Sequence, residues 1–261
     1  MLNYASRIVV KVGTSTLAYG NGKTNIRHME ALVKVLADLL NAGLQVVLVS
    51  SGAIGVGVGK LGLSVRPGDT PGRQAASAVG QCELMFMYDK MFSEYGHTVG
   101  QLLITKSDVD DGERRRNLIN AFEKLFVFGA IPIVNENDSV AVDEIVYGDN
   151  DSLSAIVAKL IGADLLVILT DRDGLYDCDP AKFPAAKKIP VVETITAEII
   201  ELAGGAGSKL GTGGMGTKVQ AARIAGEAGI DTIVINGAQP QDIYRALEGE
   251  PIGTIFKAVK R

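Results

Sequence analysis

Apolar residues along this chain form two alternating kinds of segment. Short continuous runs of valine, isoleucine and leucine are separated by longer stretches in which apolar residues recur at helical spacing. The predicted strands are residues 7–12, 45–50, 99–104, 131–134, 164–170 and 231–236. The predicted helices are 26–43, about 73–94, and then 113–128, 151–161, 196–203, 215–229 and 240–248, with a glycine-rich turn expected after residue 50.

Continuous apolar runs, in place of strict in–out alternation, indicate strands that are buried on both faces. The repeated strand–helix–strand order then predicts an α/β fold, an open and mainly parallel sheet between helical layers. A length of 261 residues without an internal repeat or linker is interpreted as one domain spanning residues 1–261. Ligands of such sheets bind beyond the carboxyl ends of the strands, so the polar residues there are the first candidates for a site.

Composition excludes several classes of protein. The N-terminal stretch enters a strand pattern at once, and no apolar run approaches the roughly 20 residues of a membrane span, so a cytoplasmic protein is expected. A net charge of −4 gives no electrostatic reason to expect nucleic acid as the main partner, and no membrane partner is expected either. Cys82 and Cys178 lack CxxC spacing, and His28 and His97 have no acidic neighbours at ligand spacing, so no protein-held metal site is predicted.

Polar side chains are concentrated between Val134 and Ala155. Amides and carboxylates follow the strand 131–134 and recur just before the helix 151–161. They are Asn135, Glu136, Asn137, Asp138, Asp149, Asn150 and Asp151. Helix capping would explain one or two of the last three, but seven such residues in two clusters favour a site for a small ligand with an amine and a carboxyl group.

Three glycine-containing tracts are suited to phosphate. They are 11–15 after the first strand, 50–55 after the second, and 211–218 at the start of a late helix. Glycine allows the backbone N–H groups to approach phosphate oxygens, and a helix N-terminus adds positive potential. Lys11 interrupts an apolar strand, and Lys218 lies in the first turn of a helix, where a cation is unfavourable and a ligand is expected to compensate it.

Other motifs are weaker. Gly211–Lys218 is not a Walker A loop, because Thr217 separates the second glycine from the lysine, and two GxGxxG matches do not follow a strand directly. The charged run 108–116 is interpreted as a solvated loop and the start of a helix. Residues 170–176 follow a buried strand and are either a turn or a nucleotide contact.

Together these tracts resemble the amino acid kinase family and, within it, the group of glutamate 5-kinases. The matching pieces are VVKVGTSTL (9–17), VSSGAIGVG (49–57), QAASAVGQ (74–81), VNENDSV (134–140), GDNDSLSA (148–155), LTDRDGLYDCDP (169–180) and LGTGGMGTKVQAA (210–222). Residues 252–256 resemble the closing strand of the family. The resemblance implies the same open sheet, with a glutamate-binding N-terminal part and an ATP-binding C-terminal part.

The resemblance also implies a reaction, in which the γ-phosphoryl group of ATP passes, with Mg²⁺, to the side-chain carboxylate of L-glutamate. Lys11 and Lys218 would be catalytic, and Asp151 would hold both in position. Glutamate would be bound by Ser51, Asn135, Asp138, Asp149 and Asn150, with Asp138 and Asp149 as candidates for its ammonium group. The nucleotide would be bound by Lys11, Gly13, Thr170, Asp171, Thr212, Gly213, Gly214, Met215, Gly216, Thr217 and Lys218.

Family membership carries further expectations. They are feedback inhibition by proline, a homo-oligomer (a dimer or tetramer), and a downstream glutamate 5-phosphate reductase as a partner in proline biosynthesis. Many relatives continue into a C-terminal PUA-type domain, and this chain resembles the short form without it. Two alternatives stay open: a sibling kinase acting on N-acetylglutamate, aspartate, uridylate or isopentenyl phosphate, and a non-catalytic amino-acid-binding sensor. The retained Lys11 and Lys218 argue against the sensor.

Overall fold

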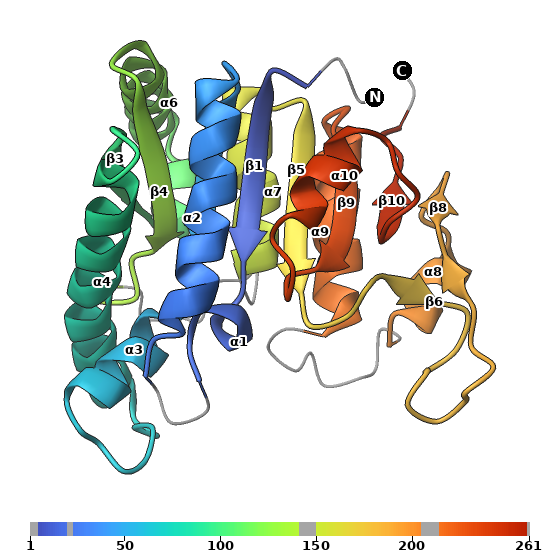
Figure 1. Cartoon of the computed structure of the whole chain (residues 1–261), viewed down its shortest axis with the longest axis horizontal. Helices are drawn as coiled ribbons and strands as arrows, with labels where there is room; N and C mark the ends of the chain where they lie inside the picture. Colours follow the sequence, from blue (N-terminus) through green and yellow to red (C-terminus); the bar gives the residue numbers. More distant parts are fainter. Residues whose placement is uncertain (1–4, 20–22, 141–149, 205–213, 260–261) are drawn as a thin grey trace. The chain divides into compact units, whose positions relative to one another are not determined.

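A computed structural model describes residues 5–19, 23–140, 150–204 and 214–259 of the chain. The chain divides into two compact units. Unit 1 contains Met1–Lys11 and Tyr147–Arg261, and unit 2 contains Val12–Val146. Figure 1 labels the helices and strands of both units.

Unit 2 is built on parallel strands. Its strands are β2 (Gln45–Ser50), β3 (Thr98–Ile104) and β4 (Ala130–Glu136), in the order β3-β4-β2. β4 pairs in parallel with both neighbours, with Leu48 opposite Ile133 and Thr98 opposite Ala130. Strands β2 and β4 are almost completely buried, as their unbroken apolar runs predict.

The helices of unit 2 begin and end where local chemistry favours it. They are α1 (Thr14–Leu17), α2 (Ile26–Asn41), α3 (Ala53–Lys60), α4 (Thr70–Ser93), α5 (Lys106–Asp110) and α6 (Gly112–Val127). The Asn25 side chain accepts a hydrogen bond from the backbone N–H of His28 and caps α2, and Asp69 does the same for Gly72 at the start of α4. In Figure 1, α2 and α4 lie in front of the strands of this unit, and α6 lies behind them.

Unit 1 carries a second set of strands. Strand β1 (Arg7–Val12), whose residues up to Lys11 belong to this unit, is followed across the sheet by β5 (Leu165–Thr170), β9 (Asp231–Asn236), β10 (Thr254–Phe256) and β8 (Val191–Val192). β5 and β9 are parallel, β10 is antiparallel to β9, and β8 is parallel to β10. A separate antiparallel pair is formed by β6 (Leu175–Tyr176) and β7 (Lys188–Ile189).

The helices of unit 1 are α7 (Asn150–Ile161), α8 (Ala197–Leu202), α9 (Met215–Glu227) and α10 (Asp242–Leu247). Figure 1 shows α7 behind β5 and α10 in front of β9, so helices cover both faces of these strands. Helix α7 is buried over most of its length, including the polar Asp151, Ser152 and Ser154. A helix that buries polar side chains in this way must provide partners for them inside the protein.

The structure confirms the predicted fold class and most of the predicted elements. Two local predictions were wrong. The glycine-rich segment after β2 is helix α3 and not simply a turn, and the run 108–116 overlaps helix α5 as well as the start of α6. Helix α3 is buried against α4, and this packing compensates for the low helix propensity of its glycines.

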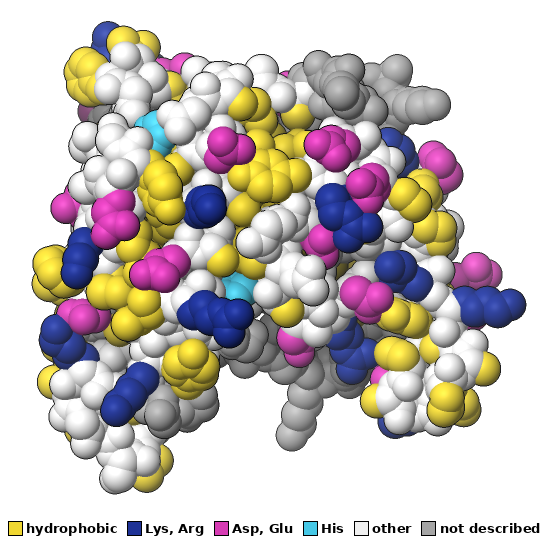
Figure 2. Space-filling view, in the orientation of Figure 1, with side chains coloured by type: hydrophobic (Ala, Val, Ile, Leu, Met, Phe, Trp, Pro, Cys, Tyr) yellow, Lys and Arg dark blue, Asp and Glu magenta, His cyan; other side chains and the backbone are white. Residues whose placement is uncertain are grey.

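The surface seen in Figure 2 carries basic and acidic side chains that are interspersed and not gathered into a patch of one sign. Among the described residues, no helix has both the length and the apolar character needed to cross a membrane.

Candidate active site

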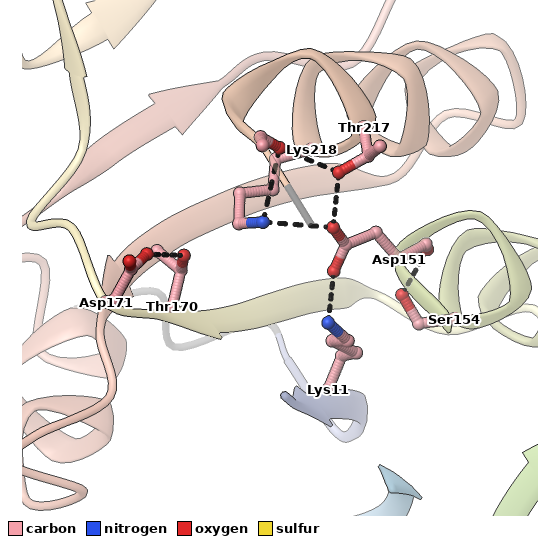
Figure 3. Close-up of polar contacts among 8 residues, drawn as sticks. Lys11, Asp151, Ser154, Thr170, Asp171, Thr217 and Lys218 are labelled. Atoms are coloured by element: carbon pink, nitrogen blue, oxygen red, sulfur yellow. Dashed lines mark hydrogen bonds and ion pairs between the residues drawn. The ribbon is translucent and has the colours of Figure 1, made fainter. Parts of the chain in front are cut away.

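A buried carboxylate joins the two lysines that the sequence singled out. Asp151, in the first turn of α7, is completely buried, and its Oδ1 lies 2.6 Å from Nζ of Lys11 on β1. Its Oδ2 lies 3.1 Å from Nζ of Lys218 on α9. Figure 3 shows the two ammonium groups each approaching a different oxygen of this carboxylate. We call Lys11, Asp151 and Lys218 the lysine–aspartate cluster; all three lie in unit 1.

The ionisation of Asp151 follows from these contacts. Burial alone would raise the pKa of Asp151, but Lys11 and Lys218, together with the Thr217 hydroxyl, hold it well below its usual range. The carboxylate is therefore ionised at neutral pH. A single carboxylate cannot neutralise two ammonium groups, so the cluster keeps a net positive charge in a buried position, which favours an anionic ligand.

Thr217 connects the same carboxylate to the glycine tract before α9. Its Oγ1 lies 2.7 Å from Asp151 Oδ2 and 2.7 Å from the carbonyl oxygen of Gly214. Gly214 is the N-cap of α9 and has extended backbone, and Met215 and Gly216 begin the helix. The N-terminal N–H groups of α9 are thus held beside the lysine–aspartate cluster, where they add positive potential.

From its position alone, Lys218 at the start of α9 was expected to be compensated by a ligand. In the structure, Asp151 of the protein itself lies against Lys218. The same carboxylate pairs with Lys11, which would otherwise be a costly cation in an apolar strand. The contacts implied for Asp151 by the family resemblance are therefore present in the structure.

The remaining predicted residues of unit 1 lie at the end of β5 and the start of α7. Thr170 ends β5 and is buried, and its hydroxyl donates to the carboxylate of the exposed Asp171 over 3.0 Å. Figure 3 shows this contact between the two side chains. Asn150 is the first residue of α7 and is half-buried. Three further predicted site residues, Asp149, Thr212 and Gly213, lie outside the described residues.

Unit 2 holds the other predicted residues. Asn135 is in β4, Asp138 follows that strand, and Ser51 and Gly13 follow β2 and β1. The backbone N–H of Ser51 donates to the carbonyl of Val12 over 3.2 Å, which joins the two turns. Gly52, the next residue, has φ +101°, a conformation that a side chain disfavours.

A pocket of about 400 Å³ opens beside the end of β4. It is lined by residues of α4, β3, the end of β4 and the segment that follows, namely Ser77, Ala78, Gln81, Cys82, Met85, Gln101, Leu103, Glu136, Asn137, Asp138 and Ser139. Burial raises the pKa of the Asp138 carboxyl, while the hydrogen bond from Ser77 and the positive charge of Arg66 oppose this rise. A carboxylate that lines a small pocket suits an ammonium group.

Sequence reasoning missed Ser77 and Gln81, which contact Asp138 and Asn135. The available signal was their spacing: two polar residues four positions apart share one face of a helix. Nothing local indicated that this face is buried.

The chain is similar in sequence to proteins of one known family. The model of the amino acid kinase family matches residues 6–236. The chain belongs to the amino acid kinase family. It is 54% identical over 259 residues to the glutamate 5-kinase of Clostridium tetani, with 99% of this chain and 97% of the relative covered. It is 52% identical over 263 residues to the glutamate 5-kinase of Clostridium perfringens, with 99% and 98% covered.

A solved structure shares the fold of this family member at low identity. The UMP kinase from Bacillus anthracis superposes with a TM-score of 0.66 at 14% identity, and the match covers 98% of this chain and 97% of that one. At this identity the likeness concerns the fold alone.

Proposed function

We propose that this protein transfers the γ-phosphoryl group of ATP to the side-chain carboxylate of L-glutamate and forms L-glutamate 5-phosphate. The observation that carries the proposal is the buried lysine–aspartate cluster, in a chain 54% identical to a glutamate 5-kinase. In this proposal the reaction is the first step of proline biosynthesis.

The chemistry requires no general base. A glutamate carboxylate is already a nucleophile, so catalysis reduces to placing the reactants in line and neutralising the charge that spreads over the transferring group. Lys11 and Lys218 are the catalytic residues in this proposal, because their ammonium groups supply that charge. Asp151 keeps both lysines at fixed positions before the substrates bind, so little reorganisation is needed during the reaction.

In the proposed assignment, unit 2 contributes most of the glutamate contacts. Asp138 binds the substrate ammonium group, and Asn135 and Ser51 supply further polar contacts. The support is the pocket at the end of β4 and the half-buried carboxylate of Asp138 within it. Asn150, the first residue of α7, is also assigned to glutamate, together with Asp149, which lies outside the described residues.

Unit 1 contributes most of the nucleotide contacts in the same assignment. The phosphates bind at the glycine tract 212–218 with Lys218, and at Lys11 and Gly13. Thr170 and Asp171 contact the nucleotide at the end of β5. The support is the placement of Gly214, Thr217 and Lys218 at the N-terminus of α9, a position suited to anions.

Magnesium enters this proposal with the nucleotide. Among the described residues, no group of three or more His, Cys, Asp or Glu side chains is arranged to hold a metal ion. Both oxygens of Asp151 are occupied by ammonium groups, an arrangement that does not suit a divalent cation. Phosphate oxygens and water are the ligands that Mg²⁺ prefers at such sites, and the ion supplies charge neutralisation there.

We further propose that proline inhibits the enzyme at a position overlapping that of glutamate. Proline shares the amine and α-carboxylate of glutamate, the groups that Asp138, Asp149 and Asn150 are proposed to recognise. In the same proposal the enzyme is a cytoplasmic homo-oligomer that passes glutamate 5-phosphate to a glutamate 5-phosphate reductase. Glutamate 5-phosphate is a reactive acyl phosphate, and rapid reduction would limit its loss to hydrolysis.

A substrate panel tests the proposed reaction. The purified protein is supplied with Mg²⁺–ATP and L-glutamate, N-acetylglutamate, aspartate, UMP or isopentenyl phosphate in turn. ADP release is measured, and hydroxylamine traps acyl phosphate as a hydroxamate. We expect turnover with L-glutamate and a glutamyl hydroxamate product. Preferred turnover with another acceptor would assign the protein to a sibling activity, and an absence of turnover with every acceptor would favour the amino-acid sensor.

A further inference from the structure

We propose that helix α4 sets the geometry of the glutamate pocket, with Ser77 and Gln81 as positioning residues for Asp138 and Asn135. The inference rests on the proposed function, in which Asp138 and Asn135 contact the amino acid. Neither Ser77 nor Gln81 is assigned a contact with ATP or with the transferring phosphoryl group.

The first contact fixes a carboxylate. The Ser77 hydroxyl donates to Asp138 Oδ2 over 2.8 Å, and Ser77 itself is almost completely buried. Asp138 lies beyond the end of β4, where strand pairing no longer holds the chain. A hydrogen bond to a charged acceptor is among the stronger ones in proteins, so this contact restricts how the carboxylate can rotate.

The second contact fixes an amide. Asn135 accepts from the backbone N–H of Glu136 through Oδ1 over 2.9 Å, which identifies the other branch of its side chain as the amino group. That amino group donates to Gln81 Oε1 over 2.9 Å. Both side chains are buried, so the pair also determines which way the Asn135 amide faces.

These two contacts come from one face of one helix. Ser77 and Gln81 are four residues apart and therefore lie one turn from each other on α4. Farther along the same helix, the Tyr88 hydroxyl lies 2.9 Å from the Ser50 hydroxyl at the end of β2, in a buried contact. Helix α4 thus carries polar contacts to the ends of both β4 and β2, next to the predicted glutamate residues.

The position of α4 is itself fixed by a close helix crossing. A Cβ atom on Gly57 of α3 would lie 1.8 Å from the carbonyl oxygen of Ala76, and one on Gly80 of α4 would lie 1.7 Å from that of Ala53. The two backbones therefore meet without intervening side chains. Because Gly80 lies between Ser77 and Gln81, the tightest part of this crossing is the part of α4 that supports the pocket.

The inference predicts a specific kinetic signature. Ser77→Ala frees the Asp138 carboxylate, and we expect the KM for glutamate to rise about tenfold, the effect of losing one hydrogen bond to a charged group. The kcat and the KM for ATP should change less than twofold, because the lysine–aspartate cluster is untouched. Ser93→Ala, which alters an exposed serine at the end of the same helix, is the matched control and should change nothing.

A double-mutant cycle separates positioning from a general structural effect. If Ser77 acts through Asp138, Ser77→Ala should lower kcat/KM for glutamate in the wild-type background but not further in an Asp138→Ala background. Gln81→Met, of similar volume but without the acceptor, should behave in the same way with Asn135→Ala. Thermal unfolding of each variant checks that it is folded.

The outcomes are distinguishable from failure of the proposed function. Wild-type turnover with glutamate is measured first, and its absence would overturn the proposed function together with this inference. If the wild type is active but the paired substitutions have fully additive effects, or if Ser77→Ala lowers kcat and leaves the KM for glutamate unchanged, the positioning role alone is overturned. Strong coupling in both cycles with an intact kcat supports it.

Discussion

Lys11 and Asp151 form an ion pair of 2.6 Å in which both side chains are buried. The carboxylate also carries Lys218 on its second oxygen, so a single aspartate orients two cations that come from β1 and α9. Positive charge in excess of the carboxylate is held in place before any ligand binds. This preorganisation is the property from which the catalytic predictions follow.

The first prediction concerns the two lysines. Lys11→Ala and Lys218→Ala should each reduce kcat by two to three orders of magnitude, since each removes transition-state stabilisation of about 3–4 kcal/mol. Lys218→Arg should retain only part of the wild-type kcat, because a planar guanidinium replaces a compact ammonium group. Lys159→Ala, an exposed lysine on α7, is the control. Near-normal turnover of either alanine variant, in a folded protein, would remove that lysine from the mechanism.

The second prediction concerns Asp151 and pH. Its folded pKa is depressed below the unfolded value of 3.8 because Lys11 and Lys218 overcome the effect of burial. The ionised carboxylate therefore contributes stability that is present above the unfolded pKa and is lost as the pH falls through the folded pKa.

Asp151→Asn tests this dependence, because it leaves two buried cations without their carboxylate. We expect it to lower the free energy of unfolding at pH 7 by about 3–5 kcal/mol. The difference from the wild type should shrink as the pH is lowered below about 4, because Asp151 takes up a proton in the unfolded chain there while it stays ionised in the folded protein. Urea unfolding of both proteins between pH 3 and pH 7 measures it, and a difference independent of pH would contradict the assigned ion pairs.

The third prediction separates the substrates. Asp138→Ala and Asn150→Ala should raise the KM for glutamate at least about tenfold, since each removes a proposed polar contact, one of them charged. The KM for ATP should change much less. Asp89→Ala, an exposed aspartate on α4, is the control for Asp138. A larger effect on the KM for ATP would move these residues to the nucleotide side.

The fourth prediction concerns proline. Initial rates at several glutamate concentrations, with and without millimolar proline, should show inhibition that excess glutamate relieves. Desensitising substitutions should then fall between residues 138 and 150. Inhibition that glutamate fails to relieve would indicate a separate allosteric site, and no inhibition would mean that this protein lacks feedback inhibition by proline.

The fifth prediction concerns the crossing of α3 and α4. Gly80→Ala would place a methyl group 1.7 Å from the Ala53 carbonyl oxygen, which backbone movement alone can relieve. Overpacking a core usually lowers the free energy of unfolding by about 1–3 kcal/mol, and we expect a decrease of about 3 kcal/mol for Gly80→Ala. Gly112→Ala, where a Cβ meets nothing within 4 Å, is the control. Equal stability of the two variants would show that the crossing is looser than the structure indicates.

The sequence by itself determined the six long strands, most helices and the residues with unusual chemistry, but not the short strands β6, β7 and β8. Buried parallel strands require continuous apolar runs, so β1, β2, β5 and β9 could be located almost residue by residue. Lys11 was recognisable because it breaks such a run, and Lys218 because a cation at a helix start is unfavourable. Both signals depend only on neighbouring residues, so they can be recognised in a single sequence.

Tertiary structure decided the partners of these residues and the conformation of the segment after β2. Asp151 meets Lys218 across 67 positions of the chain, and Ser77 meets Asp138 across 61. Helical and strand periodicity relates residues only a few positions apart, so neither pairing could be derived from spacing. Helix α3 forms despite its glycines because Gly57 and Gly80 allow α3 and α4 to pack backbone against backbone, an energetic gain that exists only once both helices are in place.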